Sequence, residues 1–341
     1  MAVRRVTLGD VAREAGVSLG TASEALSGSG RMTETTRTLV REAAQRLGYR
    51  ANALARGLRT GRTRAIGLHV LNAADNFDNE YFREFVAGVA DVAVEHDYDL
   101  NLLSSNPDRR RVVSPQVDGI ILPDPLATDV RAIELLDSGI PLVAGERLPP
   151  GMPASPVIGI DHETALARLL DHAYAAGARR PVLLAADEQS GWGVVLRDVF
   201  ARWCAEHDVD GIHTPSPFEN GRFLVVGEEM VGSLLTRHVD VDLLIVPGEH
   251  AARAALRLIA EAGRRVGRDI MLAACADAHL HEVLDPPVTA LNLTPRLLGA
   301  TCAEALIRHL DHGTVIEEVT LLPAELVTRA STAPLAADCR L

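Results

Sequence analysis

VTLGDVAREAGVSLGTASEALSG, residues 6–28, is the stretch that decides the fold of the N-terminal part of the chain. Thr7 is followed three residues later by Asp10, a capping-box pattern that predicts the start of a helix. Gly16 supplies the left-handed backbone that a tight turn needs, and Ser18 is a favourable N-cap for a second helix. The stretch therefore predicts two short helices joined by a glycine turn.

The second of these helices has two different faces. Ala22, Ala25 and Leu26 form an apolar side that can pack on the first helix. The opposite side carries small or polar residues: Leu19, Gly20, Thr21, Ser23 and Glu24. A rigidly held helix with such a face suits entry into the major groove of DNA. An ordinary helical hairpin within a core is the alternative, and the charge distribution favours DNA binding.

Charge is divided unevenly along the chain. Residues 1–64 hold 12 arginines and five acidic residues, whereas residues 65–341 hold 22 arginines and 41 acidic residues. The formal net charge of −12 therefore combines a basic head with an acidic body. The head can neutralise phosphates, and the body repels them. DNA contact is accordingly expected in the head alone.

Composition excludes several classes of protein. A chain of 341 residues, 47% of them hydrophobic, can bury two or three cores. No apolar run is long enough to cross a bilayer, and the first ten residues lack a signal-peptide pattern, so we expect a cytoplasmic protein without membrane contact. The four cysteines are scattered and indicate reduced thiols.

Catalysis has little support in the sequence. No glycine-rich phosphate loop follows a strand, and no nucleophile and base can be paired, so we expect no cofactor and no enzymatic activity. The run DAHLHE at 277–282 could suggest a metal site. A mixed loop after a strand is the simpler interpretation, and we expect no metal.

Residues 29–64 extend the basic head. Thr33 is a cap for a third helix at about 34–47, which Gly48 ends. A further helix at about 52–59 is too short to be stable alone and would need DNA or a partner helix. Leu58 in this segment fits a wedge that unstacks bases in the minor groove. A flexible basic linker is the alternative.

Apolar strands and amphipathic helices alternate through the body. This alternation predicts an α/β fold of two lobes, each with a doubly wound parallel sheet. Strands are expected at 65–71, 99–103, 117–122, 140–144, 157–160, 181–186, 243–246 and 270–274. Helices are expected at 81–95, 129–138, 162–176, 193–207, 249–262 and 295–311. A ligand cleft between such lobes lies at the carboxyl ends of the strands.

The runs TLGDVAREAGVSLGTASEALSG (7–28) and GYRANALARGLRTGRTRAIGL (48–68) resemble the headpiece and hinge helix of the lac repressor/galactose repressor family of bacterial transcription regulators. The resemblance implies an all-α helix-turn-helix DNA-binding headpiece at 1–50 and a hinge helix or linker at 51–64. It implies base contacts from Leu19, Gly20 and Glu24, and phosphate contacts from Ser18, Thr21, Ser23 and Ser27. Further DNA contacts are expected from Thr7, Arg31, Asn52, Leu54 and Ala55, with Leu58 as the intercalating leucine beside Arg59.

Glu24 departs from the family pattern, which usually has a basic residue there. A carboxylate cannot donate to guanine O6 and N7, although it can accept from cytosine N4. Ala51 also replaces a proline that usually precedes the hinge helix. The resemblance therefore implies an operator that is not typical of the family.

The body resembles the periplasmic sugar-binding-protein fold in VDGIIL (117–122), GIPLVAGER (139–147), GIDHETA (159–165) and LDPPVTALNLTPRLLG (284–299). The resemblance implies an effector-binding and dimerisation domain at 65–341. Lobe one would take 65–159 and 291–321, and lobe two 160–290 and 322–341. The implied effector contacts are Asn72, Asp75, Phe77, Glu146, Arg147, Trp192, Arg197, Glu249 and Asp277. Trp192 would stack on a ring of the ligand, with core packing as the alternative.

These observations predict a sequence-specific transcription regulator, a repressor that binds double-stranded operator DNA. A small-molecule effector, a sugar or related metabolite, would change its affinity for the operator through closure of the lobes. An operator with two half-sites related by two-fold symmetry implies a homodimer. The alternatives are a small-molecule binding protein and an enzyme on the same α/β platform. Neither alternative requires a basic head.

Overall fold

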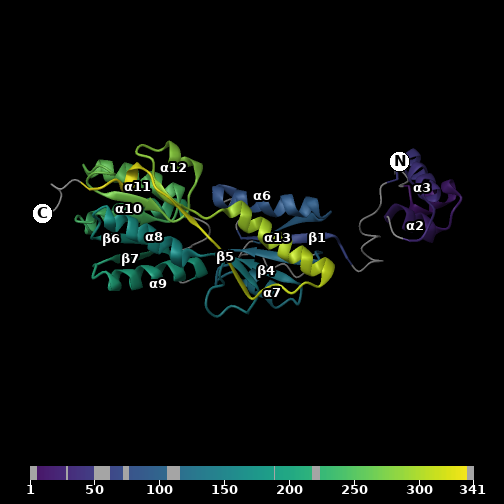
Figure 1. Cartoon of the computed structure of the whole chain (residues 1–341), viewed down its shortest axis with the longest axis horizontal. Helices are drawn as coiled ribbons and strands as arrows, with labels where there is room; N and C mark the ends of the chain where they lie inside the picture. Colours follow the sequence, from purple (N-terminus) through teal and green to yellow (C-terminus); the bar gives the residue numbers. More distant parts are fainter. Residues whose placement is uncertain are drawn as a thin grey trace. The chain divides into compact units, whose positions relative to one another are not determined.

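The computed structural model describes residues 6–27, 30–49, 62–71, 77–105, 116–187, 189–216 and 223–335. The chain divides into two units, Met1–Thr63 and Arg64–Leu341, each with hydrophobic cores of its own (Figure 1). Within the described ranges, no helix combines the length and the apolar character needed to cross a membrane.

Within its described residues, the first unit contains three helices: α1 (Leu8–Ala15), α2 (Leu19–Ser27) and α3 (Glu34–Leu47). The capping box of Thr7 and Asp10 starts α1, and Thr33 caps α3 through the N–H of Thr36 at 3.3 Å. Gly16 and Gly48 end α1 and α3 with φ of 66° and 64°, a region that glycine enters without steric cost. The core consists mainly of small side chains: Val11, Ala12, Ala15, Ala22, Ala25, Val40, Ala43 and Ala44. The helices can therefore approach closely in a unit of this size.

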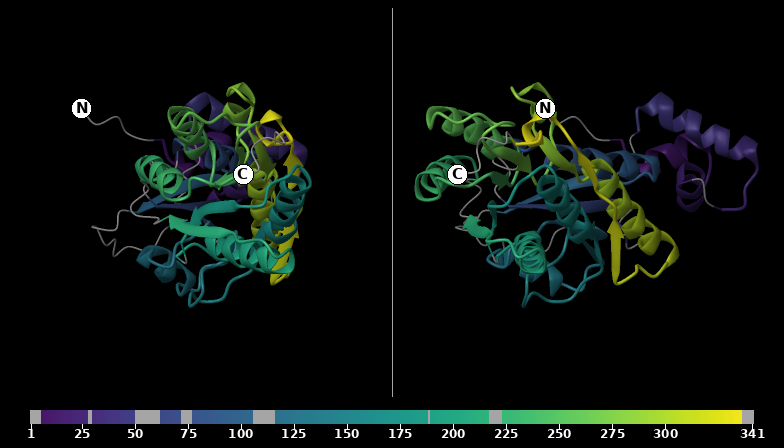
Figure 2. Two further views of the ribbon diagram at one scale, coloured as in Figure 1. Left: turned by 90° about the vertical axis from the view of Figure 1, so that its left-hand side faces the viewer. Right: turned by 60° about the vertical axis from the view of Figure 1, so that its left-hand side comes forward.

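The second unit contains two six-stranded sheets that make two lobes (Figures 1 and 2). The sheet of the first lobe has the order β11-β5-β4-β3-β1-β2, and every pairing in it is parallel. Its strands are β1 (Ala65–Leu71), β2 (Asp99–Ser105), β3 (Gly119–Pro123), β4 (Leu142–Gly145), β5 (Val157–Ile160) and β11 (Val319–Leu322). Its helices are α6 (Glu80–Glu95), α7 (Val130–Leu136) and α13 (Pro295–His312).

The sheet of the second lobe has the order β12-β10-β9-β8-β6-β7. It is parallel except that β12 pairs antiparallel with β10 at one edge. Its strands are β6 (Pro181–Ala186), β7 (Ile212–Ser216), β8 (Leu243–Val246), β9 (Met271–Ala274), β10 (Thr289–Asn292) and β12 (Glu325–Val327). Its helices are α8 (His162–Ala175), α9 (Gly191–Glu206), α10 (Phe223–Arg237), α11 (Glu249–Glu261) and the short α12 (His279–Val283).

The chain passes between the lobes at three places, after β5, after β10 and between β11 and β12. Each lobe is therefore assembled from separate stretches of sequence. Three parallel connections of this kind can act as a hinge, because the lobes share no continuous sheet.

Helices α6 and α13 of the first lobe pack unusually closely. A Cβ atom at Gly88 of α6 would collide with the carbonyl oxygen of Arg296, and one at Gly299 of α13 would collide with that of Phe85. Glycine at these two places lets the helix backbones touch. Phe85, which is fully buried, then fills the space between α13 and the sheet.

Five elements of the second lobe were not predicted from the sequence: strands β7, β10 and β12 and helices α10 and α12. Strand β7 and helix α10 occupy the interval between the helix expected at 193–207 and the strand expected at 243–246. The sequence of β7, IHTPS, contains a proline and only one large apolar residue. An edge strand tolerates such a sequence because one of its sides is unpaired.

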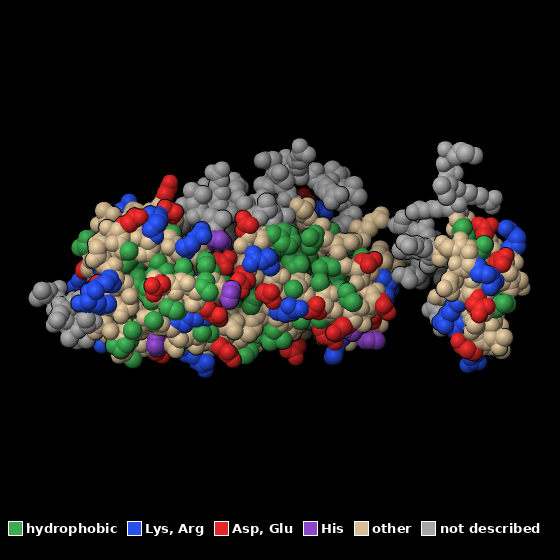
Figure 3. Space-filling view, turned by 90° about the horizontal axis from the view of Figure 1, so that it is seen from above, with side chains coloured by type: hydrophobic (Ala, Val, Ile, Leu, Met, Phe, Trp, Pro, Cys, Tyr) green, Lys and Arg blue, Asp and Glu red, His purple; other side chains and the backbone are tan. Residues whose placement is uncertain are grey.

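The surface of the lobes carries mixed charge with apolar interruptions. On the face seen in Figure 3, hydrophobic side chains gather in the region of α6, among acidic and basic ones. Val94 of α6 and Leu297 of α13 are 75% and 52% exposed. Large exposed apolar side chains on two neighbouring helices are a common property of surfaces that associate.

Candidate DNA-reading helix and interlobe pocket

Helix α2 is held in place by a local cap and by its own alanines. The hydroxyl of Ser18 accepts the N–H of Thr21 at 3.1 Å and lies 2.8 Å from the hydroxyl of Thr21. Ala22 and Ala25 are fully buried against the other helices. The opposite face of α2 is consequently directed to solvent.

That solvent face contains residues predicted to read DNA. Leu19 is 58% exposed, Gly20 and Glu24 are exposed, and Thr21 and Ser23 are half-buried. Ser18 and Arg31 are exposed beside the helix. An exposed leucine at the start of a helix is available for contact with a thymine methyl group.

Thr7 has a structural role as well as a place in the predicted DNA contacts. Its backbone N–H and its hydroxyl both donate to Asp10, at 2.9 and 2.7 Å. The predicted contacts Asn52, Leu54, Ala55, Leu58 and Arg59 lie outside the described residues, and so does the side chain of Ser27.

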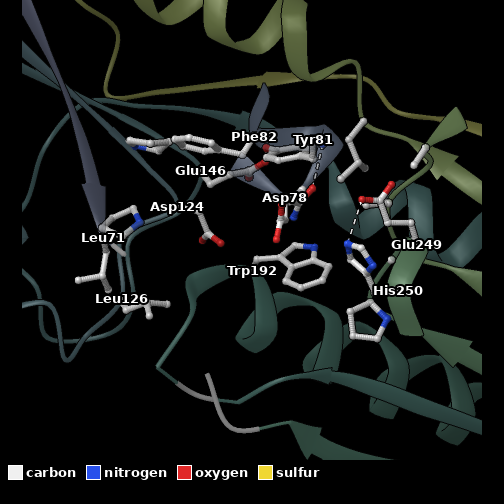
Figure 4. Close-up of a pocket in the computed structure, with 18 of the residues that line it drawn as sticks. Leu71, Asp78, Tyr81, Phe82, Asp124, Leu126, Glu146, Trp192, Glu249 and His250 are labelled. Atoms are coloured by element: carbon white, nitrogen blue, oxygen red, sulfur yellow. Dashed lines mark hydrogen bonds and ion pairs between the residues drawn. The ribbon is translucent and has the colours of Figure 1, made fainter. Parts of the chain in front are cut away.

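A cavity of about 210 Å³ lies between the two lobes (Figure 4). The first lobe contributes the end of β1, the start of α6 and the residues that follow β3 and β4. The second lobe contributes the starts of α8, α9 and α11 and the residues that follow β9. The pocket thus lies at the carboxyl ends of parallel strands, where ligands bind in open α/β folds.

Four predicted effector residues line this pocket: Glu146, Trp192, Glu249 and Asp277. Three others do not. Phe77 packs edge-on against Phe82, with ring centroids 5.3 Å apart. Arg147 pairs with Glu163 at 3.5 Å, and Arg197 pairs with the neighbouring Asp198 at 2.9 Å.

The remaining predicted effector residues, Asn72 and Asp75, lie outside the described part of the chain. Both arginines belong to segments that begin in the cleft, but each side chain pairs with a carboxylate beyond the pocket lining. The structure therefore does not bring Arg147 and Arg197 together with the other predicted contacts.

Glu146 is the centre of a buried polar cluster. Its carboxylate accepts the hydroxyl of Tyr81 at 3.0 Å and the N–H of Ile160 at 3.4 Å, and it lies 3.1 Å from Nε2 of His162. Glu146 and His162 are each 3% exposed. Burial, together with the nearby charge of Glu146, raises the pKa of Tyr81 well above its ordinary value. Tyr81 therefore remains a neutral hydrogen-bond donor.

Two acidic residues at strand ends have an unusual backbone. Asp124, directly after β3, has φ of 39°, and Glu146, directly after β4, has φ of 105°. Residues other than glycine rarely adopt positive φ, and where they do the strain often belongs to a functional site. At both positions the backbone places a carboxylate in the pocket lining.

Asp124 is the acidic group with the most perturbed ionisation in the pocket. Burial and the neighbouring charge of Glu146 raise its pKa from 3.8 to about 7. The hydroxyl of Ser190 is its hydrogen-bond donor, at 3.5 Å. A carboxyl group with this pKa changes its charge close to neutral pH.

Trp192, the second residue of α9, lies beneath these carboxylates (Figure 4). Its indole Nε1 is buried, and no hydrogen-bond partner for it is found within the described ranges. His162 approaches it edge-on, with ring centroids 6.3 Å apart. An indole N–H usually has a partner when buried, so this donor is available to a ligand.

The carboxylate of Asp277 is hydrogen-bonded to other side chains of the protein. Both terminal nitrogens of the Arg329 guanidinium, Nη1 and Nη2, donate to its carboxylate, at 2.9 and 2.8 Å, and Nδ1 of His281 lies at 3.1 Å. Burial acts to raise its pKa, but the hydrogen bonds from His281 and Arg329 lower the pKa to about 2. His279 points to solvent, with its side chain 74% exposed. No cluster of metal-ligating side chains occurs in the described part of the chain.

Contacts bridge the lobes on two rims of the pocket. On one rim, the carboxylate of Glu80 accepts the N–H of His279 at 3.1 and 3.2 Å, and the N–H of Glu80 donates to Glu249 at 3.4 Å. On the other rim, the N–H of Ala127 donates to the carbonyl of Gln189 at 2.8 Å. These bonds hold the two lobes together across the pocket.

Several pocket residues were missed by the sequence analysis. Tyr81, Asp124, His162 and the rim residue Glu80 have no motif of their own. Their common signal is position, because Asp124 follows a strand and the other three lie in the first three residues of helices. In open parallel sheets such ends border the ligand cleft, so the predicted strands and helices already indicate these positions.

Comparisons with known proteins agree with this architecture. Residues 7–52 match the model of bacterial regulatory proteins of the lacI family, and residues 170–332 match the periplasmic binding protein-like domain. The regulator AglR of Rhizobium meliloti is 31% identical over 96% of this chain and 95% of its own length. The chain belongs to the LacI family. Catabolite control protein A of Priestia megaterium is 26% identical over 96% of this chain and 99% of its own length.

Solved structures of this family share the fold. The lac repressor dimer bound to operator and the anti-inducer ONPF superposes with a TM-score of 0.82 at 23% identity, covering 97% of this chain and all of that one. The regulator CelR in its cellobiose complex has a TM-score of 0.69 at 26% identity, covering 96% of this chain and all of that one. The predicted fold class and family are thereby confirmed. Like its LacI-family relatives, this protein is a DNA-binding transcriptional regulator and not an enzyme.

Proposed function

We propose that this LacI-family regulator is a cytoplasmic repressor that binds operator DNA as a homodimer and responds to a small molecule in the interlobe pocket. The observation that supports the DNA-binding role most directly is the solvent face of α2, exposed at Leu19, Gly20 and Glu24 on a capped scaffold. The net charge of +7 on residues 1–64 adds attraction to phosphates. The solved lac repressor dimer is bound to operator, which makes operator DNA the natural partner to test.

The predicted domain limits are part of the proposal. We retain a headpiece at 1–50, a hinge segment at 51–64 and an effector domain from 65 onward. In this scheme Leu58 enters the minor groove and Arg59 lies beside it, while Ser18, Thr21 and Ser23 contact phosphates. The solvent-exposed position of Ser18 and the half-buried positions of Thr21 and Ser23 leave their hydroxyls near the surface that would meet DNA.

The proposed dimer would use the first lobe. Val94 and Leu297 present large apolar side chains on adjacent helices, and burying them in an interface removes apolar surface from water. A C2 dimer uses the same surface of both copies and places two headpieces for two half-sites.

The effector part of the proposal depends on the interlobe pocket. A ligand that prefers one degree of lobe closure shifts the equilibrium between closures by its difference in affinity. The Glu80–His279 and Ala127–Gln189 bonds are contacts that closure makes and opening breaks. Cellobiose in the CelR complex shows a sugar on a protein of this fold, and we propose a small polar metabolite here.

Selection from a random pool of double-stranded DNA with the full chain tests the DNA-binding role. We expect enrichment of one near-palindromic sequence, with two half-sites related by a dyad. Retention of DNA without an enriched sequence would contradict site-specific repression. A single non-repeated half-site, with a monomeric mass in solution, would contradict the dimer.

A further inference from the structure

The interlobe pocket has a distinctive charge. Six carboxylate side chains and three histidines contribute to its lining, and within the described ranges no arginine does. The chain contains no lysine. The acidic residues are Asp78, Asp124, Asp129, Glu146, Glu249 and Asp277. A ligand in this pocket therefore meets a surface of negative potential.

Most of these carboxylates already have a cationic or imidazole partner. Asp277 pairs with Arg329 at 2.8 Å, and His69 lies 2.6 Å from Asp129 with both side chains buried. Glu146 has His162 at 3.1 Å, and Glu249 has His250 at 3.3 Å. Four of the six carboxylates therefore have a partner within the protein.

Asp124 and Asp78 differ from the other four. For neither carboxylate does the described part of the chain provide an ion pair. Asp124 has a neutral hydroxyl donor, Ser190, and the nearby Glu146 has the same sign of charge. Figure 4 shows the Asp124 and Asp78 side chains extending into the space beside Trp192. An aromatic face next to uncompensated carboxylates is the environment that binds an organic cation.

A second observation indicates a ligand in the same place. The Trp192 indole N–H and Nδ1 of His162 are buried and have no hydrogen-bond partner within the described residues. The His162 side chain is 97% buried, and both residues line the pocket. Unpaired buried polar atoms carry a free-energy cost that a hydrogen-bonding ligand can remove.

We propose that the effector is a small hydroxylated ring that carries a protonated amine, with the ammonium group beside Asp124 and Asp78 and the ring against Trp192. This inference rests on the proposed role of the pocket as the effector site. A neutral hydroxylated ring could form hydrogen bonds to the same oxygens but would leave the charge of Asp124 uncompensated. A carboxylated or phosphorylated ligand would add a like charge without an arginine to receive it.

The ionisation of Asp124 gives the proposal a measurable consequence. With a pKa of about 7 the empty site holds a proton for part of the time at neutral pH. A bound ammonium favours the carboxylate and releases that proton. If the pKa falls by about one unit, the affinity for the amine changes by about tenfold between the two protonation states. The charged and polar groups facing Asp124 are Glu146, His162, Tyr81 and the Ser190 hydroxyl.

The test uses the full chain and three matched sugar pairs: glucosamine and glucose, galactosamine and galactose, mannosamine and mannose. Glucuronate serves as the anionic probe. Thermal unfolding identifies the probes that bind, since a ligand selective for the folded state raises the Tm. Calorimetry in buffers of different ionisation enthalpy then measures Kd and the protons released. We expect at least one amine to bind about tenfold or more tightly than its neutral partner, with proton release.

Asp124→Asn separates charge from hydrogen bonding, because asparagine keeps the shape and tolerates the φ of 39°. We expect this substitution to weaken binding of the amine about tenfold more than it weakens binding of the matched neutral sugar. Asp137→Asn, an exposed carboxylate at the end of α7, is the control and should change neither affinity.

Three results with the wild-type protein would overturn the inference. They are equal or tighter binding of the neutral partners, preference for glucuronate, and the absence of binding by all three amines. Equal losses for amine and neutral sugar in Asp124→Asn would do so as well. The DNA selection and the response to any sugar that binds are separate measurements. They test the proposed function independently of this inference.

Discussion

Replacing Asp124 by asparagine should stabilise the protein above neutral pH. The folded-state pKa of about 7 exceeds the ordinary value of 3.8, so the folded protein binds more protons than the unfolded chain between these pH values. Stability therefore falls as pH rises through this window, and the loss is complete above pH 7. Asparagine cannot ionise and removes this loss.

The expected change in the free energy of unfolding depends on how much of this pH range an experiment can sample. From about pH 5.5 to about pH 7 the linkage amounts to roughly 2 kcal/mol at most, at 1.36 kcal/mol for each pKa unit. Asp124 is half-buried by surface area, so water in the pocket screens it, and we expect about 1 kcal/mol. In a domain of this size that corresponds to a Tm difference of about 2 °C.

The assay is calorimetric unfolding of the wild type, Asp124→Asn and the control Asp137→Asn at pH 5.5 and pH 8. The Tm of Asp124→Asn minus that of the wild type should increase by about 2 °C from pH 5.5 to pH 8. The corresponding Tm difference for Asp137→Asn should stay constant. A difference that does not change with pH would show that Asp124 is ionised normally in the folded protein. Burial and the charge of Glu146 would then not raise the pKa of Asp124.

Three further substitutions test other parts of the account. Glu24→Arg should change the preferred base at one symmetric pair of positions in DNA selection, and an unchanged profile would mean that Glu24 does not face the bases. Glu80→Ala removes the acceptor of the His279 N–H, so the lobes should open more easily and small-angle scattering should give a larger radius of gyration. An unchanged radius would show that the Glu80–His279 hydrogen bond does not hold the lobes together. Gly299→Ala places a methyl group against the carbonyl of Phe85 and should cost about 1–3 kcal/mol in the free energy of unfolding. Gly232→Ala on α10, where a Cβ meets only Leu258 at 3.9 Å, is its control and should be near neutral.

The headpiece could be predicted well because its signals are local. Thr7, Thr33 and Gly48 define helix ends through hydrogen bonds that span three to five residues. The alternating strands of the lobes were also predictable, since buried parallel strands appear as short apolar runs. Strand β7 was missed because IHTPS has no such run and gains its structure from pairing with β6.

The pocket was harder to predict because side-chain direction depends on distant partners. Arg147 directly follows Glu146 in sequence, yet Glu146 lines the pocket while Arg147 pairs with Glu163. Arg197 pairs with Asp198, and Asp277 is held by Arg329, which is 52 residues away. Asp124 acquires its pKa from burial by both lobes and from Glu146, and none of these is visible around position 124.

The most direct test of the central claim compares the full chain with residues 64–341 on the DNA sequence obtained by selection. Fluorescence anisotropy at two salt concentrations measures the DNA affinity, and thermal unfolding with the sugar panel measures ligand binding. We predict that the full chain binds the selected site with a strong salt dependence, and that the truncated chain loses DNA binding but keeps the ligand response. Equal binding of the selected DNA by residues 64–341 would contradict the assignment of DNA recognition to the headpiece.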